Sequence, residues 1–377
     1  MAGTSRILLI SNSGLSMVKF RTPLIRQLSK KHRVIVACPK DRYTESISTS
    51  TEFRELHFLK RKSLNPIWDF MLLIEIFLLL VKTKPALVVA YTVKPAIYAS
   101  IVCGMCRRPC VAVLTGLGSG FIGGGVVRKI MEALYRLSLR FAARIVFLNE
   151  SDRSEFFRTG LAEPSKCIVV SGEGVDTDYY QPRDAISMSH WKETLRIGYI
   201  GRLLRDKGLL ELGKAVQEFS VDEMELCLVG TIDSNNPSSL SEAEYQEIAS
   251  LTNVTTFGFV EDVRDVIAGC DFIILPSYRE GLSMALLEAM SMGRPILASD
   301  IPGCRELVID GENGYTFRAR SVEALIKVIR KAILLERDEI KRMGQKSRTM
   351  IEDHFSSAII IKTMEHIFDE CIYERIK

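Results

Sequence analysis

Short apolar runs alternate with amphipathic stretches along this chain. The runs of the first half, such as RILLIS and RVIVAC, are apolar at nearly every position. Runs of this length and kind are typical of parallel strands that are covered on both faces. The strands predicted for this half span residues 6–11, 33–38, 87–91, 110–116, 144–149 and 167–170. Helical stretches lie between them, at residues 20–30, 66–82, 95–105, 126–143 and 150–159.

The same alternation starts again near residue 195. Strands are predicted at residues 195–201, 225–230, 254–260, 271–277 and 295–299. Helices are predicted at residues 207–219, 262–269, 282–292, 321–335 and 338–352. This order predicts an α/β fold made of two Rossmann-like domains, each with a doubly wound parallel sheet, that face each other across a cleft.

The predicted domains have definite limits. Residues 1–178 form the N-terminal domain, and residues 195–356 form the C-terminal domain. Residues 179–194 show neither periodicity and are predicted to be the linker. A last amphipathic helix, within residues 357–377, is expected to pack back on the N-terminal domain. Ligands of such sheets bind beyond the carboxyl ends of the strands, so the expected cleft is the default active site.

Composition and cysteine use indicate a folded intracellular protein. The chain has 377 residues and nine cysteines, an odd number, that lie mostly in apolar runs. This usage is typical of reduced thiols in the cytoplasm. The first residues, MAGTSRILLIS, lack the features of a secretory signal. Cys103, Cys106 and Cys110 have no fourth ligand at a spacing that suits zinc, so we expect no metal there.

Charge is divided unevenly along the chain. Residues 1–180 hold 26 Lys and Arg against 14 Asp and Glu, whereas the remainder holds 24 against 32. A basic half suggests an anionic partner. No nucleic-acid-binding motif is present, so a membrane surface or a lipid diphosphate fits better than nucleic acid. A solvated basic face without a partner is the alternative.

One segment is unusually apolar. Residues 67–81 read IWDFMLLIEIFLLLV and contain Asp69 and Glu75. At about 15 residues, the segment is shorter than the roughly 20 that span a bilayer. We expect a buried helix packed on a sheet. The alternative is a helix that also touches the membrane surface.

The most informative motif is PSYREGLSMALLEAMSMGRP. Glu280 lies in a loop after a predicted strand, and Glu288 lies in the helix that follows. The first backbone N–H groups of that helix would form an anion site. They belong to Gly281, Leu282, Ser283 and Met284. Carboxylates beside an anion site suit sugar hydroxyls, whereas the alternative is a solvated helix whose Glu280 complements the helix dipole.

Two further strand-to-helix loops carry cations. In GRLLRDKGLLEL, Arg202 and Lys207 follow a strand, and two cations at this position suit a diphosphate. An ordinary basic surface loop is the alternative. In SNSGLSMVKFR, Gly14 would let the backbone approach a ligand, with Lys19 and Arg21 at the start of the next helix.

Three other patterns are set aside. GLGSGFIG has Gly118, Gly120 and Gly123 in dinucleotide-site spacing, but it follows the fourth strand rather than the first. The acidic pair Asp176 and Asp178 lies outside a strand end, so we expect no metal there. None of the five histidines follows a predicted strand, which disfavours a Ser/His/Asp or metal-hydrolase mechanism.

Together, these segments resemble the retaining, nucleotide-sugar-dependent glycosyltransferases of GT-B architecture, of the family 4 type. The matching segments, in the family's order, are SNSG, GEGVDTDYYQP, GRLLRDKG, PSYREG and EGLSMALLE. The resemblance implies that Arg202, Lys207 and Glu280 carry catalysis, with both cations on the donor diphosphate and Glu280 on the donor sugar. Glu288 would bind the ribose, and Gly14 would approach the phosphate.

The resemblance also implies how the rest of the donor is held. The backbone of residues 281–284 would support sugar and phosphate, and the base, expected to be uracil, would lie near Val260. No cofactor or metal is expected beyond the nucleotide sugar. Many relatives carry a histidine where this chain has Thr115 and Gly116. The family is thought to react on one face of the sugar, with the leaving phosphate taking the acceptor's proton, so stabilisation of the diphosphate dominates.

Within the family, four segments are similar to bacterial enzymes that extend undecaprenyl-diphosphate-linked sugars, above all α-1,3-N-acetylgalactosaminyltransferases. They are SMVKFRTPLIRQL, KRKSLNPIW, VKPAIYAS and TGLGSGFI. The expected partners are a UDP-sugar, a polyprenyl-diphosphate-linked sugar and the cytoplasmic face of the cell membrane. The expected acceptor site consists of Lys19, Arg21, Tyr91, Lys94, Thr115 and Gly116. The alternatives are a GT-B UDP-N-acetylglucosamine 2-epimerase and a non-catalytic partner subunit of the same fold.

Overall fold

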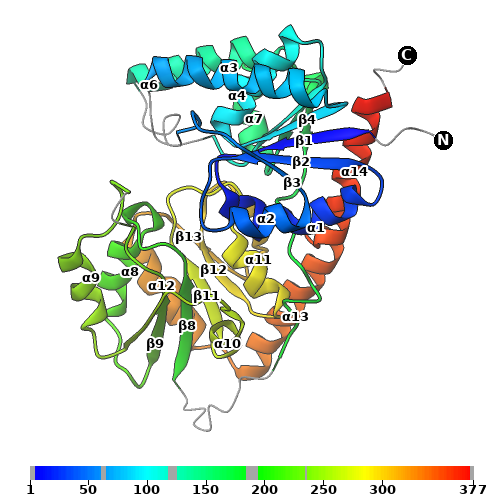
Figure 1. The fold of residues 1–377 in the computed structure, drawn as a ribbon. Helices are drawn as coiled ribbons and strands as arrows, with labels where there is room; N and C mark the ends of the chain where they lie inside the picture. The colour runs from blue at the N-terminus through cyan, green and yellow to red at the C-terminus, as the bar shows by residue number, and fades with distance from the viewer. Residues whose placement is uncertain (1–4, 61–64, 118–124, 184–193, 234–235, 374–377) are drawn as a thin grey trace. The chain divides into compact units, whose positions relative to one another are not determined.

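Two units make up the fold, which is described from a computed structural model (Figure 1). The structure describes residues 5–60, 65–117, 125–183, 194–233 and 236–373. The first unit consists of Met1–Gly174 with Ser357–Lys377, and the second of Val175–Ser356. Residues 175–178, which were predicted to belong to the N-terminal domain, are therefore part of the second unit.

The first unit is built on a seven-stranded sheet with the order β3-β2-β1-β4-β5-β6-β7. All strand pairs are parallel. The strands are β1 (Arg6–Ile10), β2 (Arg33–Cys38), β3 (Glu52–Glu55), β4 (Leu87–Tyr91), β5 (Cys110–Leu114), β6 (Arg144–Phe147) and β7 (Cys167–Val169). Their apolar side chains point alternately to the two faces, and helices cover both faces (Figure 1).

The helices of this unit form two layers. They are α1 (Gly14–Ser29), α2 (Thr44–Ser50), α3 (Pro66–Thr83), α4 (Val93–Met105), α6 (Gly125–Leu139), α7 (Glu150–Arg158) and α14 (Ser357–Tyr373), with the short 3-10 turn η1 (Pro164–Lys166). α4 packs against both α3 and α6, and α14 packs against α1 and β4. The Gln27 amide donates to Glu365 at 3.2 Å, which fixes α14 to α1.

α3 shows how the sequence starts and stops a helix. Asn65 accepts a hydrogen bond from the Ile67 N–H at 2.9 Å, and Pro66 takes the first helical position, where its missing N–H costs nothing. Lys84 ends the helix in a left-handed conformation. Over the described ranges, no helix combines the length and the apolar character that crossing a bilayer requires.

The second unit has a six-stranded sheet with the order β10-β9-β8-β11-β12-β13, again parallel throughout. The strands are β8 (Leu195–Ile200), β9 (Met224–Val229), β10 (Val254–Gly258), β11 (Phe272–Leu275), β12 (Ile296–Ser299) and β13 (Gly314–Phe317). The helices are α8 (Leu209–Val216), α9 (Glu242–Ala249), α10 (Arg264–Ala268), α11 (Met284–Ser291), α12 (Val322–Ile333) and α13 (Arg337–His354), with 3-10 turns η2 (Arg205–Lys207) and η3 (Arg305–Leu307).

The predicted α/β class, with two doubly wound parallel sheets, is confirmed. Four short elements, namely β3, α2, α9 and β13, were not predicted from the sequence. Two helix starts were also wrong. α1 begins at Gly14, six residues earlier than expected, because the Ser13 hydroxyl accepts the Ser16 N–H and caps it. α11 begins at Met284, after the Ser283 cap.

Candidate active site

The two motifs of the second unit meet where its strand order changes direction. β8 and β11 are neighbours in the sheet, although two other strands, β9 and β10, lie between them in the sequence. In doubly wound sheets, the loops after two such strands diverge and leave a binding crevice at the carboxyl edge. The loop after β8 carries Arg202 and Lys207, and the loop after β11 carries Glu280.

A glycine brings these loops into contact. Gly208 has a φ of +71°, and a Cβ placed on it would lie 2.1 Å from the Pro276 carbonyl oxygen. Only glycine allows this backbone conformation and this approach together. The Tyr278 N–H also donates to the Asp206 carbonyl at 2.9 Å. The turn before α8 therefore lies directly on the loop after β11.

The Glu280 carboxylate is the centre of the resulting cluster. It forms an ion pair with the Lys207 ammonium and accepts the Ser277 hydroxyl at 2.6 Å. The Lys207 and Glu280 side chains are 20% and 13% exposed, so both charges are only partly hydrated. An ion pair in this setting is stronger than a surface pair, yet both groups remain within reach of a ligand.

Buried polar side chains lie next to the cluster and the loop after β8. Cys304 is fully buried, and burial together with the Glu280 charge raises the pKa of its thiol well above the usual range. The buried Tyr199 hydroxyl donates to the Arg202 carbonyl at 2.9 Å and so fixes the backbone of that loop. The Arg202 side chain itself is exposed. This position leaves the guanidinium able to contact an anion from solution.

The start of α11 differs in detail from the expected anion site. Ser283 is its N-cap and accepts the Leu286 N–H at 3.4 Å, so Gly281 and Leu282 lie in the preceding loop. Gly303, with a φ of +79°, packs so closely that its Cβ would lie 2.4 Å from the Gly281 carbonyl oxygen. Met284 begins the helix and is partly buried. The loop is thus held from two sides, by η2 and by the segment after β12.

Glu288 projects from the second turn of α11 and is 3% exposed. Its partner is the Tyr180 hydroxyl. Burial, the Glu288 charge and the hydrogen bond between them all raise the pKa of Tyr180. The Ser291 hydroxyl donates to the Tyr180 carbonyl at 2.7 Å, which ties this part of the expected linker to α11. Tyr180 was not singled out in the sequence analysis.

The expected base site belongs to the outermost strand of the second sheet. Val260 follows the edge strand β10 and is partly buried against the core of the unit. Phe257 and Phe259, its neighbours, are 42% and 66% exposed. β10 lies two strands from β8, so Val260 and Arg202 share the carboxyl edge of one sheet.

In the first unit, the backbone at Gly14, which was expected to contact a phosphate, is already hydrogen-bonded to a carboxylate of the protein. The Asp41 carboxylate accepts the Gly14 N–H at 2.8 Å and the Leu15 N–H at 3.1 Å. A Cβ on Gly14 would lie 2.4 Å from an Asp41 oxygen. The glycine is therefore required by this carboxylate, and the first N–H groups of α1 already bind an anionic group.

A buried polar cluster lies where the strand order of the first sheet changes, between β1 and β4. The Arg21 guanidinium, 2% exposed, stacks 4.0 Å from the Tyr91 ring centroid and pairs with Glu173. It also donates to the Ser16 carbonyl at 2.7 Å. Burial raises the pKa of Glu173, against the opposing effect of the Arg21 charge.

Three buried atoms of this cluster have no hydrogen-bond partner among the described residues. They are Arg21 Nε, Tyr91 Oη and Thr92 Oγ1. Thr92 also has a φ of +72°, which is unfavourable for a β-branched residue. Unsatisfied buried polar atoms and backbone strain at one place are characteristic of binding sites.

The other expected acceptor residues do not join this cluster. Lys19 is exposed on α1, two positions before Arg21 and on a different face of the helix. Lys94 pairs with Asp69 of α3 at 2.7 Å. Thr115 and Gly116 follow β5, and Gly116 has a φ of +144°. Gly118, Gly120 and Gly123 lie outside the described residues.

The motifs set aside as metal sites have structural partners. Cys103 on α4 faces Cys110 of β5, and hydrogen bonding to Cys110 together with burial raises the pKa of Cys103. The Asp176 carboxylate accepts the N–H groups of Asp178 and Tyr179 at 3.0 and 2.9 Å, forming a local turn. Within the described ranges, no group of three His, Cys, Asp or Glu is arranged to hold a metal ion.

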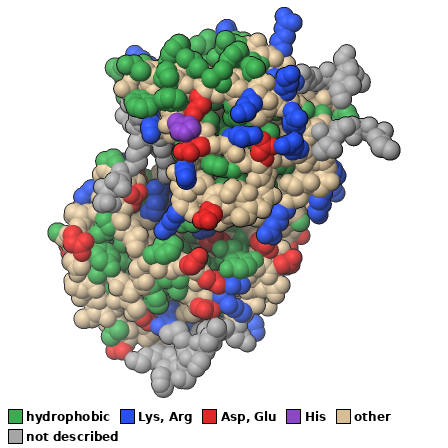
Figure 2. All heavy atoms as spheres, viewed as in Figure 1, with side chains coloured by type: hydrophobic (Ala, Val, Ile, Leu, Met, Phe, Trp, Pro, Cys, Tyr) green, Lys and Arg blue, Asp and Glu red, His purple; other side chains and the backbone are tan. Residues whose placement is uncertain are grey.

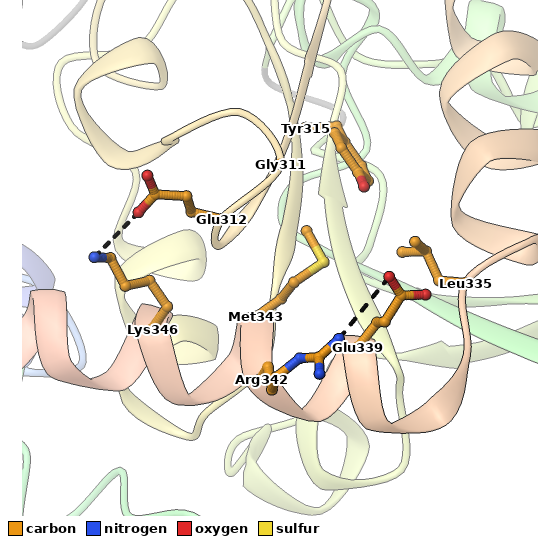
Figure 3. A pocket seen from close by; sticks show the side chains of 8 residues that line it. All are labelled: Gly311, Glu312, Tyr315, Leu335, Glu339, Arg342, Met343 and Lys346. Carbon is orange, nitrogen blue, oxygen red and sulfur yellow. Dashed lines mark ion pairs between the residues drawn. The ribbon is translucent and has the colours of Figure 1, made fainter.

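A separate pocket of about 310 Å³ lies in the second unit between the turn before β13 and α13 (Figure 3). Two ion pairs flank it, Glu312 with Lys346 at 3.1 Å and Glu339 with Arg342 at 4.0 Å. Tyr315 is near the amino end of β13. The pocket is therefore at the opposite edge of the sheet from Lys207 and Glu280 and does not belong to their site.

Family models match both units. Residues 6–149 match the model described as glycosyl transferase 4-like, and residues 194–334 match the model described as glycosyl transferases group 1. Together, the two matches take in most of the chain and both sheets. The chain is a glycosyltransferase with domains of these two types.

Curated relatives of this glycosyltransferase have the names of glycosyltransferases. A Campylobacter jejuni protein named N,N'-diacetylbacillosaminyl-diphospho-undecaprenol alpha-1,3-N-acetylgalactosaminyltransferase is 29% identical, over 97% of this chain and 99% of the relative. A Staphylococcus aureus capsular polysaccharide biosynthesis glycosyltransferase, CapM, is 25% identical over 81% and 82%. An Escherichia coli UDP-Gal:alpha-D-GlcNAc-diphosphoundecaprenol alpha-1,3-galactosyltransferase is 24% identical over 82% and 80%.

Solved structures share the fold of this glycosyltransferase. Anabaena HepE in complex with UDP superimposes with a TM-score of 0.79 at 19% identity, covering 97% of this chain and all of the other. Sucrose-phosphate synthase from Thermosynechococcus elongatus gives 0.80 at 17% identity, covering 98% and 100%. At these identities, the likeness concerns the fold.

Proposed function

We propose that this glycosyltransferase moves a sugar from a UDP-sugar to an undecaprenyl-diphosphate-linked sugar, with retention of configuration, during assembly of a bacterial surface polysaccharide. The donor sugar would be N-acetylgalactosamine or another N-acetylhexosamine. The observation that carries the proposal is the cluster of Lys207, Glu280 and Ser277 at the strand-order change of the second sheet. The names of the Campylobacter, Staphylococcus and Escherichia relatives support the choice of acceptor.

Arg202 and Lys207 would stabilise the departing diphosphate, which is the contribution that this reaction needs most. When the bond to the sugar breaks, negative charge develops on the departing diphosphate. Fixed positive groups stabilise that charge better than water does, because they need not reorient. Lys207 is held by the close contact of Gly208 with Pro276, and Arg202 extends from a loop whose carbonyl is fixed by Tyr199. With these two cations on the diphosphate, we expect transfer without a metal ion.

The carboxylates would recognise the donor. Glu280 accepts two hydrogen bonds in the free protein, from Lys207 and Ser277, and its second oxygen is suited to a hydroxyl of the donor sugar. Glu288 would accept the ribose hydroxyls. Since its carboxylate is 3% exposed and bonded to Tyr180, the ribose would have to replace that hydroxyl as hydrogen-bond donor.

The acceptor would bind the first unit at the cluster of Arg21 and Tyr91, with Thr92 added from the structure. These residues supply the three unpartnered polar atoms at the strand-order change of the first sheet. Lys19, Lys94, Thr115 and Gly116 stay candidates of the same proposal. Because the acceptor's lipid lies in the bilayer, we also propose that the protein works at the cytoplasmic membrane surface.

The decisive experiment supplies each labelled UDP-sugar with a synthetic undecaprenyl-diphosphate-linked sugar and analyses the product linkage. The proposal expects an α-linked product, formed at the same rate with and without a chelator. Transfer only to water-soluble sugars would refute the lipid-linked acceptor. Release of an epimerised UDP-sugar without transfer would favour the epimerase alternative, which the transferase names of the relatives do not support.

A further inference from the structure

α3 carries a second apolar face, directed away from the unit. Its buried face consists of Leu72, Ile76, Leu79 and Leu80, which pack in the core. The exposed apolar side chains are Ile67, Trp68, Phe70, Ile74, Phe77, Leu78 and Val81. Their spacing of three or four residues makes a stripe along the whole helix, where a helix of a water-soluble unit normally has polar side chains.

The two acidic residues of α3 do not interrupt this stripe, because both are turned toward the protein. Asp69 is 18% exposed and pairs with Lys94 at 2.7 Å. Glu75 is 15% exposed and accepts the backbone N–H groups of His57 and Phe58 at 2.8 and 3.1 Å. The exposed face therefore carries no acidic charge between its first and last apolar residue.

α6 repeats the arrangement. Tyr135, Ser138 and Leu139 are buried, whereas its exposed apolar positions are Val126, Val127, Ile130 and Leu137, followed by Phe141 just beyond its end. α4 packs against both α3 and α6, and Met105 at its end is 71% exposed. Figure 2 shows hydrophobic side chains gathered over this layer of helices. We call these exposed side chains of α3, α4 and α6 the apolar face.

Cations surround the apolar face. The Lys60 ammonium lies 5.4 Å from the Trp68 ring centroid, and the Arg140 guanidinium lies 4.6 Å from that of Phe141. The other exposed cations on these helices and at their ends are Lys82, Lys84, Arg107, Lys129 and Arg136. An apolar stripe with flanking Lys and Arg is the pattern of a helix that lies in the headgroup region of an anionic membrane.

We infer that α3 and α6 together dock the protein on an anionic bilayer, with the apolar face inserted at the level of the headgroups. The charges favour a lipid surface over a second copy of the chain, because two such basic borders would repel each other. The inference rests on the proposed function only for its purpose, which is to reach a membrane-borne acceptor. Binding to lipid is measurable without any sugar.

The test is co-sedimentation with vesicles of phosphatidylethanolamine and phosphatidylglycerol, compared with vesicles of phosphatidylcholine. The double variants Phe70→Gln/Leu78→Gln on α3 and Ile130→Gln/Leu137→Gln on α6 remove exposed apolar surface and keep good helix formers. Each should lower the vesicle partition coefficient at least about tenfold. The matched control, Val221→Gln/Leu334→Gln, removes side chains that are 48% and 83% exposed in the second unit and should bind like the wild type.

A spectroscopic readout locates the contact. The chain has two tryptophans, Trp68 and Trp191. In a Trp191→Phe background, binding should shift the emission of Trp68 to shorter wavelength on anionic vesicles. All variants should keep the wild-type thermal unfolding curve and the wild-type rate with a water-soluble acceptor analogue, while the α3 and α6 variants lose transfer to vesicle-borne acceptor.

Three results would overturn the inference. One is a wild-type protein that does not sediment with anionic vesicles, whatever its transfer activity. Another is equal binding by the α3, α6 and control variants. The third is a wild-type dimer in the absence of lipid that the α3 and α6 variants dissociate, which would assign the apolar face to a second copy of the chain.

Discussion

The pair of Lys207 and Glu280 allows structure and function to be separated in one experiment. Lys207→Ala removes the ammonium and leaves a carboxylate that is 13% exposed with the Ser277 hydroxyl as its protein partner. A partly buried charge without its counter-ion should lower the free energy of unfolding by about 1–3 kcal/mol. Glu280→Ala should lower the free energy of unfolding by a similar amount, because it leaves the Lys207 ammonium without its counter-ion. Urea denaturation at neutral pH measures both.

The double variant Lys207→Ala/Glu280→Ala removes both charges together. No unpaired charge then remains, so the double variant should be more stable than the sum of the single losses predicts, with a coupling of roughly 1–2 kcal/mol. Transfer should behave differently. Loss of a group that stabilises the departing diphosphate should lower kcat by about 10²–10³ in Lys207→Ala, and the double variant should be at least as slow.

Arg205 supplies the matched control, since it lies in the same 3-10 turn and pairs with Glu244 of α9 at 2.5 Å. Its side chain is 40% exposed, so Arg205→Ala should change stability by less than about 1 kcal/mol and leave the transfer rate unchanged. If transfer recovered with stability in the double variant, the ion pair would be a structural contact, and the assignment of Lys207 to the donor diphosphate would be refuted.

Three further outcomes are expected. Glu288→Gln should raise KM for the UDP-sugar about tenfold with little change in kcat, because a ribose contact exists both before and during the reaction. In steady-state kinetics, a loss confined to kcat would contradict this role. Asp41→Ala should lower the free energy of unfolding by about 1 kcal/mol, measured in urea, by leaving two N–H groups of α1 without their acceptor; an unchanged midpoint would show that water replaces the carboxylate at no cost. Hydrogen bonds from Arg205 and the Ser241 backbone lower the pKa of Glu244 from 4.5 to about 2, so its stabilisation is complete above pH 4.5 and is lost as the pH falls toward 2. Glu244→Gln should therefore be less stable than the wild type at neutral pH and equal to it in acid, and a pH-independent difference would disprove the linkage.

Strand positions, and the charged residues in the loops after them, were predictable because local sequence determines them. Apolar runs gave the central strands of both sheets, and cations or carboxylates directly after them indicated Arg202, Lys207 and Glu280. β3 was not predicted because three of the four residues in EFRE are charged, as suits an edge strand. β13 was not predicted because GYTF is only four residues long. α1 was started too late because SNSGLS was interpreted as a loop, although Ser13 is its cap.

The contacts between distant segments were not predictable in the same way. Arg21 and Glu173 are 152 residues apart, and the ion pair forms because both segments reach the carboxyl edge of the first sheet. One indication of this pair was present in the sequence. Glu173 lies directly before Gly174 in the segment GEGVDTDYYQP, which the resemblance placed at the domain boundary. Tyr180 likewise lies in the predicted linker, and its bond to Glu288 depends on packing against α11.

The inward carboxylates of α3 also bear on how the chain is made. Before folding, Asp69 and Glu75 stand in a nascent apolar segment that has neither Lys94 nor the His57 backbone as partner. A charged residue near the middle of a bilayer costs about 2.5–3.5 kcal/mol on insertion scales, so Glu75, at the centre of the segment, opposes its capture by the insertion machinery during synthesis, and Asp69, in the first turn, opposes it less. Folding then hides both charges and exposes the apolar stripe. Asp69→Leu/Glu75→Leu should therefore increase integration of this segment into the membrane.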